Sequence, residues 1–82
     1  MEPFLGQVCF FAFMFTPRGW HECDGSLMSI AQNNALFALL GTQYGGDGRS
    51  TFALPKIAPM QLETGATVKA YIALEGIFPS RP

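Results

Sequence analysis

The longest stretch of apolar residues lies near the N-terminus, at residues 8–15, and contains four of the eight phenylalanines. Apolar and polar positions do not alternate within it, and the turn-forming sequence Pro17-Arg18-Gly19 follows soon after. A continuous apolar run of this length beside a turn is typical of a β-strand that is buried on both faces. We therefore predict a strand over residues 8–15. In so small a chain, a partner subunit can supply the cover for one of its faces.

A second strand is predicted over residues 67–78, near the C-terminus, where Pro79 ends it. One face would carry Val68, Ala70, Ile72, Leu74 and Gly76, and the other Tyr71, Ala73, Glu75 and Ile77. The two long strands stand at opposite ends of the chain and are the natural pair. We expect them to form a small antiparallel sheet in which both terminal segments take part.

A helix is predicted over residues 30–40 from its end signals and its apolar positions. Ser29 can cap the first turn, and Gln32 stands three residues later, as in a capping box. Gly41 follows the last apolar position and is a natural helix stop. Packing of this central helix on the terminal strands would make one α+β domain over residues 1–82.

The remaining segments are shorter, and turn residues separate them. Short strands are predicted at residues 21–23 and 50–54, with a tight turn at Asp24-Gly25 between them. Residues 26–28 would lead into the helix, and residues 56–65 would be irregular. Residues 42–49 contain three glycines in four positions and predict a long Gly-rich loop.

Composition narrows the classes of protein to which the chain can belong. Only 13% of its residues are charged, against about 25% in a typical soluble domain, and 49% are apolar. Disordered segments combine low hydrophobicity with high net charge, so the chain is not one of them. The formal charge is -1, and the five basic residues stand singly rather than in a basic stripe. We therefore expect a folded domain that does not bind nucleic acid.

The apolar content exceeds what a domain of 82 residues can easily bury. A domain of this size hides only about 60% of the surface that its unfolded chain exposes. Large exposed apolar patches usually mark interfaces, so we expect the terminal strands to bury theirs against copies of the same chain. The residues predicted for self-association are Val8, Phe10, Phe11, Phe13, Phe15, Tyr71, Ile72, Leu74, Ile77 and Phe78.

No segment is predicted to enter a membrane. The longest charge-free run, residues 3–17, is shorter than the roughly 20 apolar residues that a bilayer crossing needs. Glu2 stands where a signal peptide carries positive charge, and no small-residue cleavage site follows Phe15. We therefore expect synthesis in the cytoplasm without a signal peptide.

Residues that often carry chemistry are few and are not arranged for catalysis. His21, Cys23 and Asp24 are close in sequence, but a single histidine at this spacing does not supply a tetrahedral metal site. The glycine loop lacks the lysine of a P-loop, and its Asp47 has no neighbouring carboxylates to hold calcium. We expect no metal, no cofactor and no catalytic centre. Cys9 and Cys23 could form one disulfide, and the sequence does not decide whether they do.

Three stretches, taken together, resemble the phage tail collar domain, which occurs in short tail fibres and in bacterial microcystin-dependent proteins. The first stretch, Gly6 to Gly25, contains Pro17-Arg18-Gly19-Trp20 and Cys23-Asp24-Gly25. The second, Leu27 to Pro55, contains Tyr44-Gly45-Gly46-Asp47-Gly48-Arg49. The third runs from Tyr71 to Arg81. The resemblance covers most of the chain. It implies a self-associating structural module of a particle rather than an enzyme. Family members usually continue after Phe-x-Leu-Pro with a long Gly-rich variable region, whereas here Pro55 leads into Lys56-Ile57-Ala58-Pro59. The chain thus resembles a minimal form without that region.

The sequence leads to two main functional hypotheses. The first is a self-assembling tail-fibre or collar subunit of a virion tail or similar particle, in contact with other tail proteins. The family implies a trimer, whereas contact between unlike surfaces would give an open extracellular filament. The second is a small adhesin that binds a receptor, glycan or peptide through the loop residues Trp20, His21, Tyr44 and Arg49.

Overall fold

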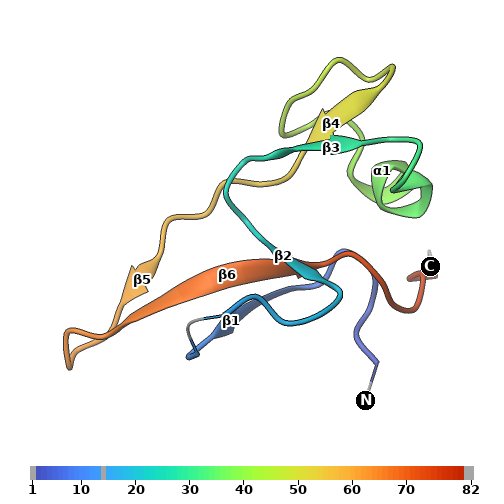
Figure 1. Ribbon diagram of the computed structural model, residues 1–82. Coiled ribbons are helices and arrows are strands. Elements are labelled where there is room, and N and C mark those ends of the chain that lie inside the picture. The colour runs from blue at the N-terminus through green and yellow to red at the C-terminus, as the bar shows by residue number, and fades with distance from the viewer. Residues whose placement is uncertain (1, 14, 81–82) are drawn as a thin grey trace.

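The larger of two sheets is built around one long strand, β6 (Thr67–Ala73), in the computed structural model, which describes residues 2–13 and 15–80. Strand β1 (Val8–Phe11) pairs antiparallel with β6. Strands β2 (Trp20–Glu22) and β5 (Met60–Gln61) also pair antiparallel with β6, and the main order is β1–β6–β2. The N- and C-terminal strands therefore meet in one antiparallel sheet, as predicted (Figure 1).

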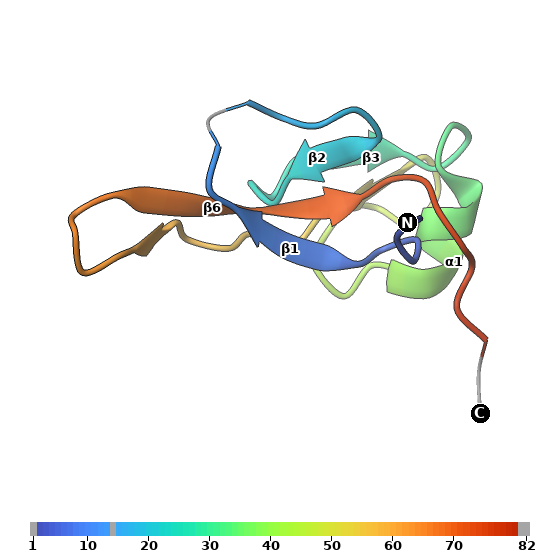
Figure 2. The ribbon, with the colours of Figure 1, turned by 90° about the horizontal axis from the view of Figure 1, so that it is seen from below.

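A smaller layer lies beside one face of this sheet (Figures 1 and 2). It consists of the antiparallel pair β3 (Leu27–Ser29) and β4 (Thr51–Ala53), together with helix α1 (Asn34–Leu40). The core joins the two layers, and its buried members are Leu5, Cys23, Leu36, Phe52, Leu54, Ala70 and Ile72. The fold is a small α+β arrangement of mostly antiparallel strands with one short helix.

The first strand is shorter than predicted and is not buried on both faces. It ends at Phe11, where the chain bends, and Phe10 keeps 43% of its surface exposed. Met14, in the predicted range, lies outside the described residues, as does Arg81 of the last resembling stretch. The strand buried on both faces is instead β6, where residues 70–73 are at most 3% exposed. The reason is that Ala70 and Ile72 belong to the core on one face of β6, while the ring of Phe11 covers Tyr71 on the other face.

The last strand also ends earlier than predicted, at Ala73. Beyond it the chain bends, and Ile77 forms a short parallel bridge with Phe4 instead of continuing the antiparallel ladder. Gly76 permits this close passage of the two terminal segments. Its φ is +144°, and a Cβ there would press on the carbonyl oxygen of Pro3.

Helix α1 begins at Asn34, later than predicted, because Ser29 is the last residue of β3. The Ser29 hydroxyl still accepts a hydrogen bond from the Gln32 N–H at 3.4 Å, so these residues close a turn before the helix. The predicted helix lead-in at residues 26–28 is largely strand β3. Gly41 ends the helix as predicted, and its N–H donates to the Phe37 carbonyl at 2.8 Å.

The smaller predicted strands have shifted ends. Strand β2 starts one residue before the predicted 21–23, and β4 lies inside the predicted 50–54. Strand β5 interrupts the segment 56–65 that we predict to be irregular. Across residues 2–13 and 15–80, no helix has the length and apolar character that a membrane crossing requires.

Candidate self-association surface

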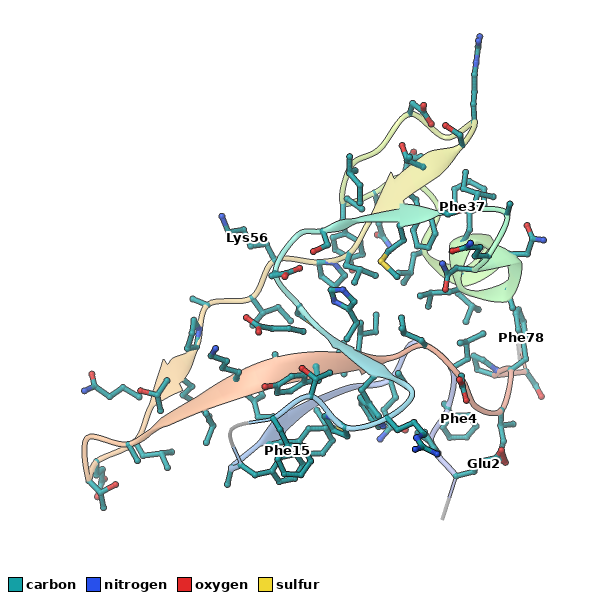
Figure 3. All side chains as sticks on the ribbon, in the orientation of Figure 1. Glu2, Phe4, Phe15, Phe37, Lys56 and Phe78 are labelled. Carbon is teal, nitrogen blue, oxygen red and sulfur yellow. The ribbon has the colours of Figure 1, made fainter. Side chains whose placement is uncertain are left out.

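Five aromatic side chains gather on the face of the larger sheet that points away from the core. Tyr71 of β6 lies between two core residues in sequence, so its side chain takes the opposite face. Phe11 of β1 lies 5.6 Å from Tyr71 and 5.0 Å from Trp20, measured between ring centroids. Phe13 stacks on Phe11 at 5.0 Å, and Phe15 stacks on Phe13 at 4.5 Å. We call these five residues the aromatic cluster; Figure 3 labels Phe15 at its outer end.

Exposure rises along the aromatic cluster. Tyr71 is 3% exposed, Phe13 is 41% exposed and Phe15 is 65% exposed. Aromatic pairs at such separations gain about 0.5–1.5 kcal/mol beyond the effect of area burial. The stack therefore holds the outer two rings in place while a single copy of the chain leaves much of their surface open to solvent.

Two further groups of apolar side chains are exposed. Val8 and Phe10, on the other side of β1, are 39% and 43% exposed at the margin of the sheet. Where the terminal segments meet, Phe4, Ile77 and Phe78 are each at least half exposed, and we call these three the terminal patch. Figure 3 shows Phe4 and Phe78 near the chain ends and Phe15 well apart from them.

The structure exposes six of the residues predicted for self-association, namely Val8, Phe10, Phe13, Phe15, Ile77 and Phe78. Phe11 and Leu74 are half-buried. Ile72 is buried in the core, and Tyr71 is buried beneath the ring of Phe11 on the opposite face, so neither offers open surface to a partner. Sequence reasoning missed four exposed apolar residues in segments too short to show a pattern: Phe4, Leu27, Met60 and Leu62.

The four residues predicted to bind a ligand do not come together. Trp20 and His21 lie in β2 of the larger sheet, whereas Tyr44 and Arg49 lie in the segment between α1 and β4 (Figure 1). Trp20 is half-buried and packs edge-on against Phe11. The His21 Nδ1 atom lies 2.8 Å from the carbonyl oxygen of the next residue. These side chains therefore do not form one site.

A hollow of about 470 Å³ lies between the end of β2 and residues 56–59. Its lining includes Glu22, Cys23 and Asp24 but none of the four candidate ligand residues. Burial, with the charges of Asp24 and Glu22 adding to it, raises the pKa of the Cys23 thiol to about 11. The reactive form of a cysteine is the thiolate, so this thiol is a poor nucleophile. In the described part of the chain, no three His, Cys, Asp or Glu side chains cluster as metal ligands.

Asp47 organises the segment between α1 and β4. Its carboxylate accepts hydrogen bonds from the N–H groups of Arg49, Ser50 and Thr51 at 2.9, 3.0 and 3.0 Å. These bonds, that of Thr51 first, hold the pKa of Asp47 well below its usual range. An anion bound to this loop would need the same donors, and the chain's own carboxylate already occupies them.

Comparison with protein families gives one match. Residues 6–59 match the family model of the phage tail collar domain. The matched segment contains β1, β2 and the smaller layer, and it ends just before β5 and β6. No curated protein and no solved structure matches the chain significantly.

Proposed function

The chain belongs to the phage tail collar domain family, and from this premise we propose that it is a self-assembling structural subunit of a phage tail or a phage-tail-like particle. The collar domain is a structural domain of phage tails, and its family is not a family of enzymes. Membership implies a location in the virion tail, in association with other tail proteins. Self-assembly of this particular chain is our proposal, and the exposed apolar surface supports it.

The observation that carries the proposal is the amount of aromatic surface left open. Five phenylalanines, at positions 4, 10, 13, 15 and 78, are between 41% and 65% exposed. With about 200 Å² for a whole phenylalanine side chain, they leave about 500 Å² uncovered. A standard interface buries about 800 Å² on each partner. The open phenylalanine surface, divided among the aromatic cluster, the terminal patch and the margin of β1, thus adds up to more than half the area that one such interface buries on each partner.

Burial of this surface has a large effect on the scale of the domain. At about 25 cal/mol for each Å² of apolar area, 500 Å² corresponds to about 12 kcal/mol per subunit before the costs of association. The whole folding free energy of a small domain is about 5–15 kcal/mol. The burial term of association is therefore comparable in size with the folding free energy of the chain itself.

For the symmetry of the assembly, we propose first a threefold contact, because the family resemblance implies a trimer. The second is an open filament. The aromatic cluster and the terminal patch are separate surfaces, and contact between two unlike surfaces generates a ring when it closes and a filament when it does not.

The adhesin hypothesis receives less support. Its four residues lie in separate parts of the fold, and Trp20 packs within the aromatic cluster. We therefore do not propose a ligand for them.

The proposal is tested by the molar mass of the purified chain, measured by light scattering during size-exclusion chromatography at micromolar concentration. We expect a mass that is a multiple of the 8.9 kDa chain. A stable monomer at that concentration would overturn the proposal.

A further inference from the structure

Strand β1 is an outer strand of the larger sheet, and Figure 2 shows it at the margin beside β6. At its start, the Gly6 N–H donates to the Ala73 carbonyl and the Ala73 N–H donates to the Gln7 carbonyl, both at 2.9 Å. Gly6 has a φ of +82°, as expected for the first residue of a β-bulge. These two bonds establish which residues of β1 face the neighbouring strand.

The residues of an antiparallel strand alternate between those that exchange hydrogen bonds with a neighbour and those whose main-chain groups point away from it. With the Gln7 carbonyl bonded to β6, Cys9 and Phe11 face β6 as well. Val8 and Phe10 then direct their N–H and C=O groups to the open edge. Among the described residues, no backbone hydrogen bond reaches these groups from another segment.

This edge carries neither the charged residues nor the prolines that usually prevent strands of different molecules from pairing. Proteins protect open edges with charged residues, prolines, bulges or very short strands. No charged residue occurs between Pro3 and Pro17, and the bulge at Gly6 lies before the strand. By contrast, the opposite edge is formed by β2, which has three residues and carries Glu22 in an ion pair with Lys69 at 3.8 Å.

We propose that β1 pairs antiparallel with β1 of a second copy, about a twofold axis at Cys9. Only outward-facing residues can exchange hydrogen bonds across the new edge. An axis at Cys9 places Val8 opposite Phe10 of the partner and Phe10 opposite Val8, so both outward-facing residues are used. An axis at Val8 would require residues of the bulge, and an axis at Phe10 would require Ala12, where the chain already bends.

The apolar surface at this edge fits a second copy as the occupant. Val8 and Phe10 are 39% and 43% exposed. Across the axis, Val8 of one copy would lie beside Phe10 of the other. Cross-strand pairs of aromatic and β-branched residues contribute to sheet stability. The two β6-centred sheets would join into one continuous sheet.

This pairing rests on the proposed self-assembly and adds a symmetry to it. A twofold contact alone gives a dimer. Combined with a threefold axis perpendicular to it, the twofold pairing gives a hexamer. Combined with a second twofold contact, it gives a closed assembly such as a tetramer when the two axes intersect at a suitable angle, and a filament when they do not. A closed assembly therefore contains an even number of chains.

The pairing places the two copies of Cys9 directly opposite each other, at a position without exchanged hydrogen bonds. The Cα atoms at such positions are about 4.5 Å apart, within the roughly 4.4–6.8 Å that a disulfide spans. The experiment is oxidation of the assembled protein with diamide, which takes up the two thiol hydrogens as the disulfide forms. We expect most of the chain to run as a dimer on a non-reducing gel and as a monomer after reduction.

Three variants control this experiment. Cys9→Ser should abolish the linked dimer. Thr64→Cys, made in the Cys9→Ser protein, places a thiol in the exposed turn between β5 and β6. This variant measures how much disulfide-linked dimer arises from random collision, and it should give little. Phe10→Lys places a charge on the open edge and should prevent linkage through Cys9. Phe10 is 43% exposed, so circular dichroism should show that this variant still folds.

The possible results separate the pairing from self-assembly itself. Linkage through Cys9 that is absent in Phe10→Lys supports the pairing. If the protein is an oligomer and its Cys9 reacts with a maleimide but does not cross-link, the pairing is overturned while self-assembly stands. A molar mass that corresponds to a simple trimer has the same two consequences. Equal linkage in the Thr64→Cys control also overturns the pairing. A monomer at micromolar concentration overturns both proposals.

Discussion

The rings of Phe13 and Phe15 stack with their centroids 4.5 Å apart and their planes 22° from parallel, although neither residue belongs to a strand. Phe13 also stacks on Phe11, so the exposed pair is anchored to the sheet. Aromatic surface that is already ordered loses little conformational entropy when a partner covers it. This stack is therefore a suitable contact for a second chain.

Removal of the outer ring should weaken assembly with little effect on folding. Because Phe15 is 65% exposed, we expect Phe15→Ser to change the free energy of unfolding of the separated chain by less than about 1 kcal/mol. We expect it to raise the dissociation constant of the assembly at least about tenfold, as for an aromatic interface residue. Analytical ultracentrifugation over a dilution series measures the second quantity.

The matched control for this prediction is Leu62→Ser. Leu62 is 41% exposed next to β5 and lies outside the aromatic cluster and the terminal patch. Its substitution should leave the dissociation constant unchanged. If the two variants weaken assembly equally, the aromatic cluster is not the contact surface.

Gly46→Ala should destabilise the fold far more than Gly65→Ala. Both glycines have a positive φ, +93° and +89°, so both substitutions carry a backbone cost of about 1–2 kcal/mol. A Cβ at Gly46 would also lie 2.7 Å from the Thr51 carbonyl oxygen and 2.9 Å from the Phe52 nitrogen, whereas a Cβ at Gly65 meets nothing within 4 Å. Urea unfolding measures the difference, and equal losses would contradict the close passage of Gly46 against β4.

Asp47 should make stability depend on pH in the acid range. The N–H groups of Thr51, Arg49 and Ser50 lower its pKa in the folded protein, so below the usual pKa the unfolded chain binds more protons than the folded one. Its contribution is complete above about pH 4, the unfolded aspartate value, and is lost as the pH falls through the folded pKa.

The measurement for Asp47 compares wild type with Asp47→Asn in urea from pH 7 to pH 2. The advantage of the wild type should be constant at neutral pH and should shrink below about pH 4. The comparison is needed because Asp24, held by the Ser26 hydroxyl, also has a lowered pKa and titrates in both proteins. An advantage that grows as the pH falls would contradict this role of Asp47.

The Cys23 thiol should be inert in the folded chain. Burial, with Asp24 and Glu22 adding to it, raises its pKa from 9.0 to about 11, which lowers the thiolate fraction about a hundredfold at pH 8. In Cys9→Ser, where Cys23 is the remaining cysteine, Ellman's reagent at pH 8 should react slowly until urea unfolds the protein. Rapid reaction without urea would contradict the burial of Cys23.

Patterns confined to one segment predicted much of this fold. The apolar run at residues 8–15 and the strand pattern at 67–78 indicated that the terminal segments pair, and Gly41 marked the end of the helix. The lengths of the strands could not be predicted in this way. The chain leaves the sheet after Phe11, where Phe13 packs back onto that ring, and β6 ends at Ala73, shortly before Gly76 passes Pro3. Both contacts depend on tertiary neighbours.

The candidate surface could be predicted only in part, because exposure also depends on tertiary neighbours. Phe10 is exposed on the outer strand β1, and Phe13 and Phe15 are exposed beyond the end of that strand, whereas Tyr71 and Ile72 of the central strand β6 are buried. Sequence periodicity does not say which of two paired strands lies in the middle. Phe4 joins the surface only through its bridge to Ile77, which no local pattern shows.

The central claim is that the exposed apolar surface of this chain is covered by other copies of it. The most direct test is its molar mass in solution, by light scattering from nanomolar to micromolar concentration. We predict a multiple of 8.9 kDa that falls to 8.9 kDa on dilution, with Phe15→Ser dissociating at a higher concentration than the wild type. A mass of 8.9 kDa across the whole range would contradict the claim.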